Sequence, residues 1–266
     1  MNPSEIKKAL SQFGSGANKR LGQHFLIDAA ALETIVEAAS IKRGDRVLEV
    51  GPGLGVLTRA LIEKGAEVSA IEQDRRFVEY LQPVSGLRVV HGDAATVHWH
   101  ELVKGDAWKF VSNLPYSITS LALRKALWAP KPPEVVVVLI QREVAERAVA
   151  KDGKTSLLSL MVGLASASAR IVRRVPPGAF YPPPKVESAI LQVVPMPWAE
   201  REQRWGIDPE KIMHVAKKGF AHPRKLLSSN LEIAPTLLSE FGLNPKARAE
   251  NLAPEDWAKL TIRLGQ

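Results

Sequence analysis

The feature that most constrains the fold is a strand, a glycine turn, a helix and a second strand in direct succession. Residues 47–50 (Val-Leu-Glu-Val) have the pattern of a buried strand, and residues 51–55 (Gly-Pro-Gly-Leu-Gly) follow as a turn. An amphipathic run then ends at Gly65, and residues 68–72 repeat the strand pattern. Such a unit joins two parallel strands by a right-handed crossover, and ligands of parallel sheets bind at the carboxyl ends of the strands. The sequence therefore predicts an α/β fold with its site at that edge.

Acidic residues stand where two of the predicted strands end. Glu72 closes the second strand, where a carboxylate can accept hydrogen bonds from both hydroxyls of a ribose. Residues 87–90 have the pattern of a third strand that leads to Asp93, which is placed to accept from an adenine amino group. A glycine turn with these acids predicts a nucleoside site, a pattern that enzymes of NAD and of S-adenosylmethionine share.

The glycine spacing favours one of these two cofactor classes. Gly51, Gly53 and Gly55 form G-x-G-x-G, whereas dinucleotide folds more usually carry G-x-G-x-x-G and leave a helix N-terminus free for pyrophosphate. Glu49 precedes the turn, and a carboxylate there repels phosphate but attracts the ammonium or sulfonium of S-adenosylmethionine. We expect S-adenosylmethionine as the cofactor, with an NAD-dependent oxidoreductase as the alternative that labelled cofactor binding would test.

A polar and aromatic loop follows the predicted strand at residues 109–111. Asn113 supplies a side-chain carbonyl, and Leu114 or Pro115 supplies a backbone carbonyl that the proline ring helps to fix. Tyr116 adds a flat ring. Two acceptors and a stacking ring suit a planar heterocycle whose exocyclic amine must be held, although Asn and Pro are also ordinary turn residues.

A second rigid segment is rich in proline and spans residues 176–188. Its fixed backbone can hold the ring of Phe180 at the mouth of a pocket, and Lys185 can meet a phosphate. The competing interpretation is a rigid crossover with a buried Phe.

The charge of the chain favours a polyanionic partner. Thirty-six Lys and Arg against 28 Asp and Glu give 36 − 28 = +8, with a pI near 9.7. The chain has no Cys, which excludes disulfides and thiolate-held zinc, and His98 and His100 lack the carboxylate cluster that would complete a metal site. We therefore expect no metal. We also expect no membrane contact and a cytoplasmic location, because apolar runs stay well short of the roughly 18 residues of a membrane span.

Composition and pattern together predict three regions. Residues 1–20 mix basic residues with glycine and read as a mobile basic arm, and residues 21–198 form the catalytic domain. Residues 199–266 form a small, basic, helical domain suited to bind RNA. The basic residues expected to contact RNA there are Lys217, Lys218, Arg224 and Lys225.

Four motifs in order resemble those of the ribosomal RNA adenine N6-dimethyltransferases. They are residues 19–26 (Lys-Arg-Leu-Gly-Gln-His-Phe-Leu), 49–55 (Glu-Val-Gly-Pro-Gly-Leu-Gly), 113–116 (Asn-Leu-Pro-Tyr) and 180–188 (Phe-Tyr-Pro-Pro-Pro-Lys-Val-Glu-Ser). The resemblance covers essentially the whole chain. The proline-rich segment and the helical tail are similar to the bacterial small-subunit enzymes whose loss gives kasugamycin resistance, rather than to the large-subunit enzymes of macrolide resistance.

This resemblance implies a class I methyltransferase domain, a Rossmann-like mixed sheet with helices on both faces, followed by a small all-α C-terminal domain. It implies dimethylation of two adjacent adenosines in a hairpin near the 3′ end of small-subunit rRNA, within a 30S pre-ribosomal particle, by a monomer. His24 and Leu26 would line the cofactor, Gly51 would adjoin its methionine part, and Asn113 would lie between cofactor and target base. Tyr116 and Phe180 would cover the faces of that base.

The sequence departs from the family at two places. His24 stands where relatives often have Asn, and residues 222–223 are His-Pro where relatives tend to have a more basic pair. Two further functions remain open. A DNA adenine methyltransferase would use a similar loop but is expected to carry a target-recognition insertion, and a protein that only binds RNA would transfer no methyl group.

Overall fold

A computed structural model describes residues 1–13, 16, 22–103, 105, 107–150 and 153–265 of the chain. The chain forms two compact units, of which the first comprises Met1–Ala145 and Arg170–Val194 and the second Glu146–Ala169 and Pro195–Gln266. The predicted boundary near residue 198 therefore needs correction, because the second unit also takes in the earlier segment 146–169.

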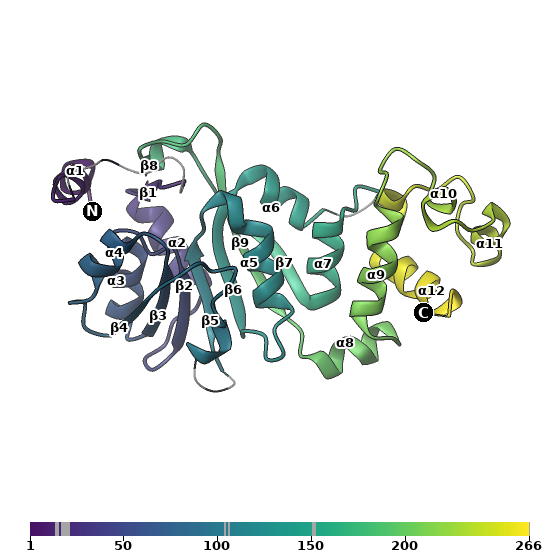
Figure 1. Cartoon of the computed structure of the whole chain (residues 1–266), viewed down its shortest axis with the longest axis horizontal. Helices are drawn as coiled ribbons and strands as arrows, with labels where there is room; N and C mark the ends of the chain where they lie inside the picture. Colours follow the sequence, from purple (N-terminus) through teal and green to yellow (C-terminus); the bar gives the residue numbers. More distant parts are fainter. Residues whose placement is uncertain (14–15, 17–21, 104, 106, 151–152, 266) are drawn as a thin grey trace. The chain divides into compact units, whose positions relative to one another are not determined.

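A mixed sheet forms the centre of the first unit (Figure 1). Its seven strands in the described residues lie in the order β4-β3-β2-β5-β6-β9-β7. In chain order they are β2 (Arg46–Val50), β3 (Glu67–Glu72), β4 (Leu87–His91), β5 (Lys109–Asn113), β6 (Val135–Gln141), β7 (Ser166–Val175) and β9 (Ser188–Pro195). The pairs from β4 to β6 are parallel, and β9 runs antiparallel to β6. The predicted α/β sheet is confirmed.

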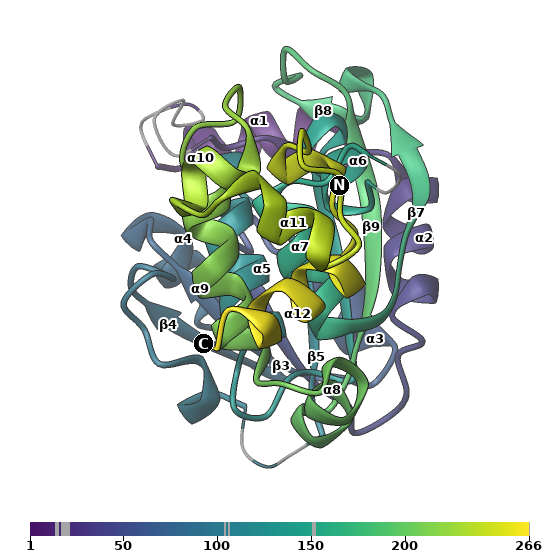
Figure 2. The same cartoon turned by 90° about the vertical axis from the view of Figure 1, so that its right-hand side faces the viewer.

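Helices cover both faces of this sheet (Figure 2). Helices α2 (Ala29–Ala38) and α3 (Val56–Glu63) lie on one face, and α5 (Thr119–Leu127) lies on the other. Asp28 caps the start of α2, because its side chain accepts a hydrogen bond of 2.9 Å from the Ala31 amide. The buried Ile35 then packs in one core cluster with Val111 of β5. Apolar burial on both sides explains why β6 is a continuous run of Val, Leu and Ile.

The parallel register brings the ends of four strands to one edge. Val50 pairs with Ile71, and Glu72 pairs with His91. The turn after β2, the end of β3, the turn after β4 and the end of β5 therefore meet at the carboxyl edge of the sheet. Helix α4 (Arg75–Leu81) follows β3, and short 3-10 turns η2 (Trp99–Glu101) and η3 (Tyr116–Ile118) precede β5 and α5 respectively.

The N-terminal segment contains a helix, α1 (Pro3–Ser11), where a mobile arm was expected. Asn2 and Glu5 form a capping box at its start, and Ile6, Ala9 and Leu10 are buried. These apolar residues have the i, i+3, i+4 spacing of a helix face, which the prediction overlooked. Ile6 packs in a cluster with Phe25 and Phe77, so this part of the predicted arm is wrong. The arm's remaining basic residues, Lys19 and Arg20, lie outside the described residues.

A two-stranded ladder joins the first motif to the proline-rich segment. Strand β1 (Phe25–Leu26) pairs antiparallel with β8 (Phe180–Tyr181), which follows the 3-10 turn η4 (Pro177–Ala179). Leu26 lies opposite Phe180, and Phe25 lies opposite Tyr181. Because side chains alternate along a strand, the two pairs face opposite sides of the ladder.

The second unit is helical (Figure 2). Its helices are α7 (Leu157–Ala165), α8 (Trp198–Trp205), α9 (Pro209–Gly219), α10 (Leu227–Leu231), α11 (Pro235–Glu240) and α12 (Pro254–Arg263), with the 3-10 turn η5 (Ala249–Asn251); α6 (Arg142–Ala148) spans the boundary of the two units. Helix α7 is apolar and packs against α9 and α12, and Leu164 accepts a hydrogen bond of 3.0 Å from the Trp205 indole. This packing explains why residues 146–169 belong to the second unit.

Candidate active site

The carboxyl edge of the sheet holds a cavity of about 330 Å³, within the size range of cofactor sites. It brings together the ends of β2, β3, β4 and β5 with the segment around β1. The sequence-predicted residues that line it are His24, Leu26, Glu49, Gly51, Gly53, Glu72, Asp93, Asn113, Leu114, Pro115 and Tyr116. Residues separated by up to 92 positions (from 24 to 116) therefore form one site.

Close contacts with neighbouring residues and the backbone conformation both favour glycine in the turn after β2. Gly51 has φ +71°, and a Cβ atom there would lie 3.1 Å from Cδ of Pro115. Gly53 has φ +56°, and its amide donates a hydrogen bond of 3.0 Å to Oε2 of Glu72. Positive φ favours glycine over other residues. The turn thus contacts both the loop after β5 and the acid at the end of β3.

Glu49 is fully enclosed below the turn. Its Oε2 accepts a hydrogen bond of 2.6 Å from the Thr58 hydroxyl. Burial raises the pKa of Glu49 to about 8, with the nearby Glu72 charge adding to the effect and the Thr58 bond opposing it. Thr58 was missed by sequence reasoning; its position in the first turn of α3, directly after the glycine turn, was the available signal.

Glu72 is held by backbone donors at the end of β3. Its Oε1 accepts a hydrogen bond of 2.8 Å from the Asp74 amide, while Gly53 serves Oε2. Burial raises the pKa of Glu72 despite these donors. Sequence reasoning also missed Asp74, which caps α4, bonds to Arg76 and accepts a 2.9 Å hydrogen bond from Gln23. Its spacing two residues beyond a strand end was the signal.

Asp93 lies in a turn after β4 and is exposed. Its Oδ1 accepts a hydrogen bond of 2.8 Å from the Ala95 amide, which fixes the carboxylate. The structure places it with Ala94 in the lining of the cavity, so the predicted acid at the third strand end faces the same space as Glu72.

The loop after β5 presents its acceptors in a defined orientation. The Asn113 side-chain NH₂ donates a hydrogen bond of 3.2 Å to the His24 carbonyl, which leaves Oδ1 as the accepting atom. Pro115 has φ −55° and ψ 129°, and its carbonyl accepts from the Ile118 amide at 3.2 Å. The loop residue Leu114 is anchored by a 3.1 Å bond from its amide to the Leu139 carbonyl.

Tyr116 is fixed at both its ring and its hydroxyl. The hydroxyl shares a hydrogen bond of 2.7 Å with the buried Ser188 hydroxyl, and burial raises the pKa of Tyr116. The His24 ring lies nearly parallel to that of Tyr116, with centroids 6.0 Å apart. His24 Nδ1 lies 2.7 Å from the Pro182 carbonyl, which can only accept, so Nδ1 carries the proton. His24 thus ties the first motif to the proline-rich segment.

Comparison with known proteins identifies the family of this site. The family model described as ribosomal RNA adenine dimethylase matches residues 14–266. The chain belongs to this family. A ribosomal RNA small subunit methyltransferase A of Phenylobacterium zucineum is 40% identical over 252 residues, which cover 92% of this chain and 87% of that protein. Its counterpart in Dehalococcoides mccartyi strain CBDB1 is 38% identical over 272 residues, covering 97% and 92% of the two chains.

A solved structure agrees with this assignment. The dimethyladenosine transferase of Plasmodium falciparum superposes with a TM-score of 0.75 at 26% identity, covering 91% of this chain and 98% of that one. The class I methyltransferase fold and the recognition of the dimethylase family are thus confirmed. Members of this dimethylase family use S-adenosylmethionine as methyl donor, as the sequence predicted for the cofactor.

In the first unit of this dimethylase, two predicted site residues lie outside the cavity lining. Phe180 is 3% exposed and packs in the core with Leu26 and Ile190, so in this structure its ring does not cover a face of the pocket. The alternation of β8 turns Phe180 inward and Tyr181 to the other side, where it packs near Phe25. The competing interpretation, a rigid crossover with a buried Phe, describes the segment better. Lys185 is exposed and is not among the residues that line the cavity.

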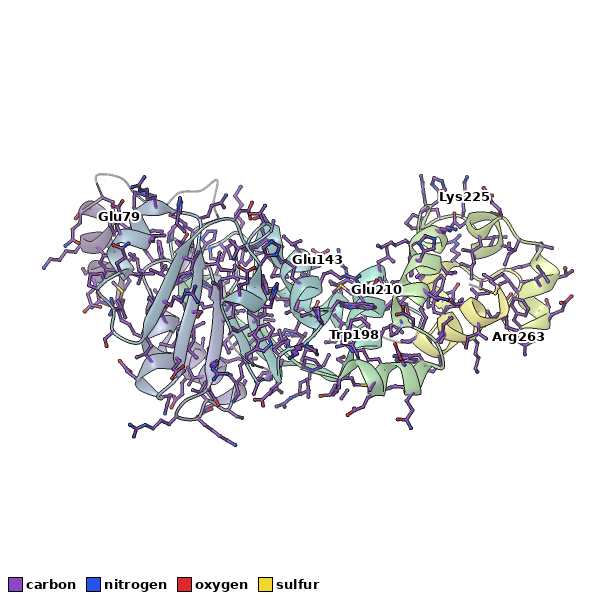
Figure 3. The ribbon with its side chains drawn as sticks, turned by 60° about the horizontal axis from the view of Figure 1, so that its bottom comes forward. Glu79, Glu143, Trp198, Glu210, Lys225 and Arg263 are labelled. Atoms are coloured by element: carbon purple, nitrogen blue, oxygen red, sulfur yellow. The ribbon has the colours of Figure 1, made fainter. Side chains whose placement is uncertain are left out.

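The predicted RNA-binding residues of the dimethylase tail are all exposed in the second unit. Lys217 and Lys218 end α9 on the side opposite its buried Ile212 and Val215, and Arg224 and Lys225 follow in the next turn. Figure 3 labels Lys225 in this turn and Arg263 near the end of α12. Gly219 fits under Trp257, where a Cβ atom would lie 2.4 Å from the indole.

Two observations concern other kinds of site. Nowhere in the described residues do three or more His, Cys, Asp or Glu side chains gather as potential metal ligands. Among the helices of the described residues, none has the length and apolar character needed to cross a bilayer.

Proposed function

We propose that this chain transfers methyl groups from S-adenosylmethionine to the N6 amines of two adjacent adenosines in the 3′-terminal hairpin of small-subunit rRNA. The observation that carries the proposal is one cavity lined both by the acids Glu49, Glu72 and Asp93 and by the loop from Asn113 to Tyr116. A nucleoside cofactor and an amine acceptor can meet only where their binding groups share a space.

The acids divide among the parts of the cofactor. The buried Glu49 suits a cationic amino acid end, because a cation restores the ionised form that burial disfavours. The Glu72 oxygens accept from the Gly53 and Asp74 amides, and a carboxylate has about four lone-pair sites, so acceptor capacity remains for a ribose hydroxyl. Asp93 uses Oδ1 for the Ala95 amide and can accept an adenine amine with Oδ2. His24 and Leu26 close the cavity from the N-terminal side. When bound, S-adenosylmethionine supplies a methyl group activated by a sulfonium.

The loop after β5 shapes the attacking amine. The N6 lone pair of adenine is delocalised into the ring, so the amine becomes nucleophilic when its two hydrogens are held and its lone pair is turned out of conjugation. Asn113 Oδ1 accepts one hydrogen. The Leu114 carbonyl is the better second acceptor, because the Pro115 carbonyl already accepts from the Ile118 amide. The anchored Tyr116 ring supplies a stacking face for an extruded base.

The substrate we propose is a 30S pre-ribosomal particle, and the enzyme acts on it as a cytoplasmic monomer. The support for an rRNA partner is the net charge of +8 and the exposed lysines that end α9. Lys185 adds a basic group in the first unit.

The test is methyl transfer by the purified protein. We expect labelled methyl groups from S-adenosylmethionine in small-subunit particles lacking the modification, with mass spectrometry of nuclease fragments finding dimethyladenosine at two adjacent positions near the 3′ end. Large-subunit particles and duplex DNA serve as controls. Transfer to either control at the same rate, or none to the small-subunit particle, would refute the proposed substrate.

A further inference from the structure

The ammonium of Lys125, on α5, is bound by three backbone carbonyls of a neighbouring turn. Its Nζ donates to the backbone carbonyls of Ala94, Ala95 and Val97 at 2.8, 2.9 and 2.9 Å. An ammonium has three hydrogens, so its donors are saturated by three carbonyls of one turn. A lysine on a helix surface would ordinarily point into water.

The turn that Lys125 holds is the turn that carries Asp93. The amides of Thr96 and Val97 both donate to the Asp93 carbonyl at 3.0 Å, and the Ala95 amide donates to its side chain. The amides of the turn therefore point inward to Asp93, and three of its carbonyls converge outward on Lys125. Without a cation there, the convergent carbonyl dipoles would repel one another.

The surroundings of Lys125 fit this role. Its Nζ lies 5.3 Å from the centre of the Trp99 ring, whose indole donates a 3.0 Å hydrogen bond to the Ala94 carbonyl. Burial lowers the pKa of Lys125, and the charge of Asp93 opposes that shift. A compact ammonium can meet three carbonyls from one point, whereas a planar guanidinium presents its donors in a fork.

We propose that Lys125 is a positioning residue for the adenine end of the cofactor, holding the Asp93 turn in the conformation that binds S-adenosylmethionine. The inference rests on the proposed function, in which Asp93 receives the adenine amine. It goes further, because α5 begins directly after the loop of Asn113 and Tyr116. One helix thus carries the target loop at its start and the tie to the cofactor turn near its end.

Calorimetric titration with S-adenosylmethionine, without RNA, tests the proposal in Lys125→Met, which keeps the aliphatic stem but removes the ammonium. We expect Kd to rise by about tenfold, the effect of losing roughly one charge-assisted hydrogen bond. At saturating cofactor, kcat should stay within about twofold of the original, because Lys125 does not contact the reacting atoms. A wild-type protein that binds no S-adenosylmethionine would instead refute the proposed function itself.

Lys109→Met is the matched control. Lys109 also donates to three oxygens, the carbonyls of Ala39 and Ser40 and the Asp45 carboxylate, at 3.1, 2.8 and 2.7 Å, but at the opposite edge of the sheet. The Lys109→Met variant should have a lower melting temperature and an unchanged Kd for S-adenosylmethionine. An unchanged Kd in Lys125→Met would overturn the proposal, because cofactor binding would then not depend on Lys125. An equal rise in both variants would overturn it too, because the rise would then be a general effect of lost stability.

Two further variants exclude a purely structural role. Lys125→Arg keeps the charge but presents it in a planar fork, so we expect only partial recovery of Kd. In an Asp93→Ala background, Lys125→Met should add less than about twofold, because both changes remove the same interaction. Fully additive effects, or failure of both Lys125→Met and Lys125→Arg to fold, would count against the proposal.

Discussion

The two ends of strand β5 show how one sheet treats buried polar groups in two different ways. At the amino edge, Lys109 pairs with Asp45 and donates to the carbonyls of Ala39 and Ser40, directly after α2. Burial alone would raise the pKa of Asp45, but the hydrogen bond and charge of Lys109 and the Lys42 amide hold it below its ordinary value. Every group at this edge that we have named finds its partner within the chain.

The carboxyl edge is arranged differently. In the part of the chain that the structure describes, Glu49 and Glu72 bond to a hydroxyl and to backbone amides rather than to a cation, and burial raises the pKa of both acids. Asn113, at the end of β5, has its NH₂ committed and its oxygen available. The comparison teaches that the amino edge stabilises the fold, while the carboxyl edge keeps acceptors for ligands at some cost in stability.

The largest expected effect comes from changing the two ends of β5 separately. Asn113→Ala removes one of the two acceptors that shape the amine, so single-turnover methylation should fall by roughly 100-fold or more while the melting temperature changes little. Lys109→Met should do the reverse, losing about 2 kcal/mol of unfolding free energy in urea with near-normal transfer by the folded protein. Near-normal turnover by the Asn113 variant would contradict the proposed mechanism.

A smaller effect is expected from the acids at the end of β3 and after β4. Glu72→Ala should weaken S-adenosylmethionine binding by about 1 to 3 kcal/mol, and Asp93→Ala by a similar amount, because each leaves a polar group of the ligand unmatched. Glu67 begins the same strand at the amino edge and is exposed, so Glu67→Ala is the control. Calorimetry decides the matter: unchanged affinity in both carboxyl-edge variants would remove the cofactor assignment.

The pH dependence of binding sharpens the comparison further. Below about pH 8 the ligand-free protein holds a proton on Glu49, and a cationic cofactor favours the carboxylate. Binding should therefore release up to about one proton at pH 7, and affinity should rise with pH by less than tenfold per unit until it levels off near pH 8. Calorimetry in buffers of different ionisation enthalpy measures the release. The same proton release by Glu49→Gln would exclude Glu49 as its source.

The same raised pKa has a consequence for stability. The folded, ligand-free protein binds a proton at Glu49 that the unfolded chain, with a pKa near 4.5, has lost above that pH. Its unfolding free energy should accordingly fall as pH rises from about 4.5 to 8, and Glu49→Gln should flatten this part of the curve.

The smallest effect is expected in the helical second unit. The changes made at the two edges of the sheet should not affect RNA binding by this unit. Replacing Lys217 and Lys218 together by Gln should reduce the slope of log RNA affinity against log salt by about 2, with cofactor affinity unchanged. Lys259→Gln, an exposed change on α12, is the control. Point changes are preferable to deleting the tail from Asp208, because α9 covers the apolar α7. An unaltered slope would mean that these lysines do not contact RNA.

Much of the site could be predicted because its signals are local. Glu72 and Asp93 stand at strand ends, and parallel strands carry their ends to one edge, so residues far apart in sequence could be placed together without knowing the packing. Phe180 could not be placed in this way. Whether a ring faces a pocket depends on its register against β1, and a shift of one residue would have exchanged Phe180 and Tyr181.

The division into units was harder to predict for a related reason. Helix α7 is apolar over most of its surface, so its sequence does not show which neighbours cover it, and only the packing against α9 and α12 assigns it to the second unit. The buried face of α1 was visible in principle, since Ile6, Ala9 and Leu10 have helical spacing. The surrounding Lys and Gly residues outweighed that short pattern.

The contact between Gly51 and Pro115 bears on how new specificities could be engineered into this scaffold. The glycine turn and the loop after β5, to which we assign the cofactor and the target base, touch, with only 3.1 Å between the place of a Cβ at residue 51 and the proline ring. A target loop grafted from a methyltransferase with another base preference would bring a different backbone to this contact. Such a graft should succeed only when the donor's glycine turn is transplanted with it, so the two segments form one exchangeable module although Pro115 lies 60 positions beyond Gly55.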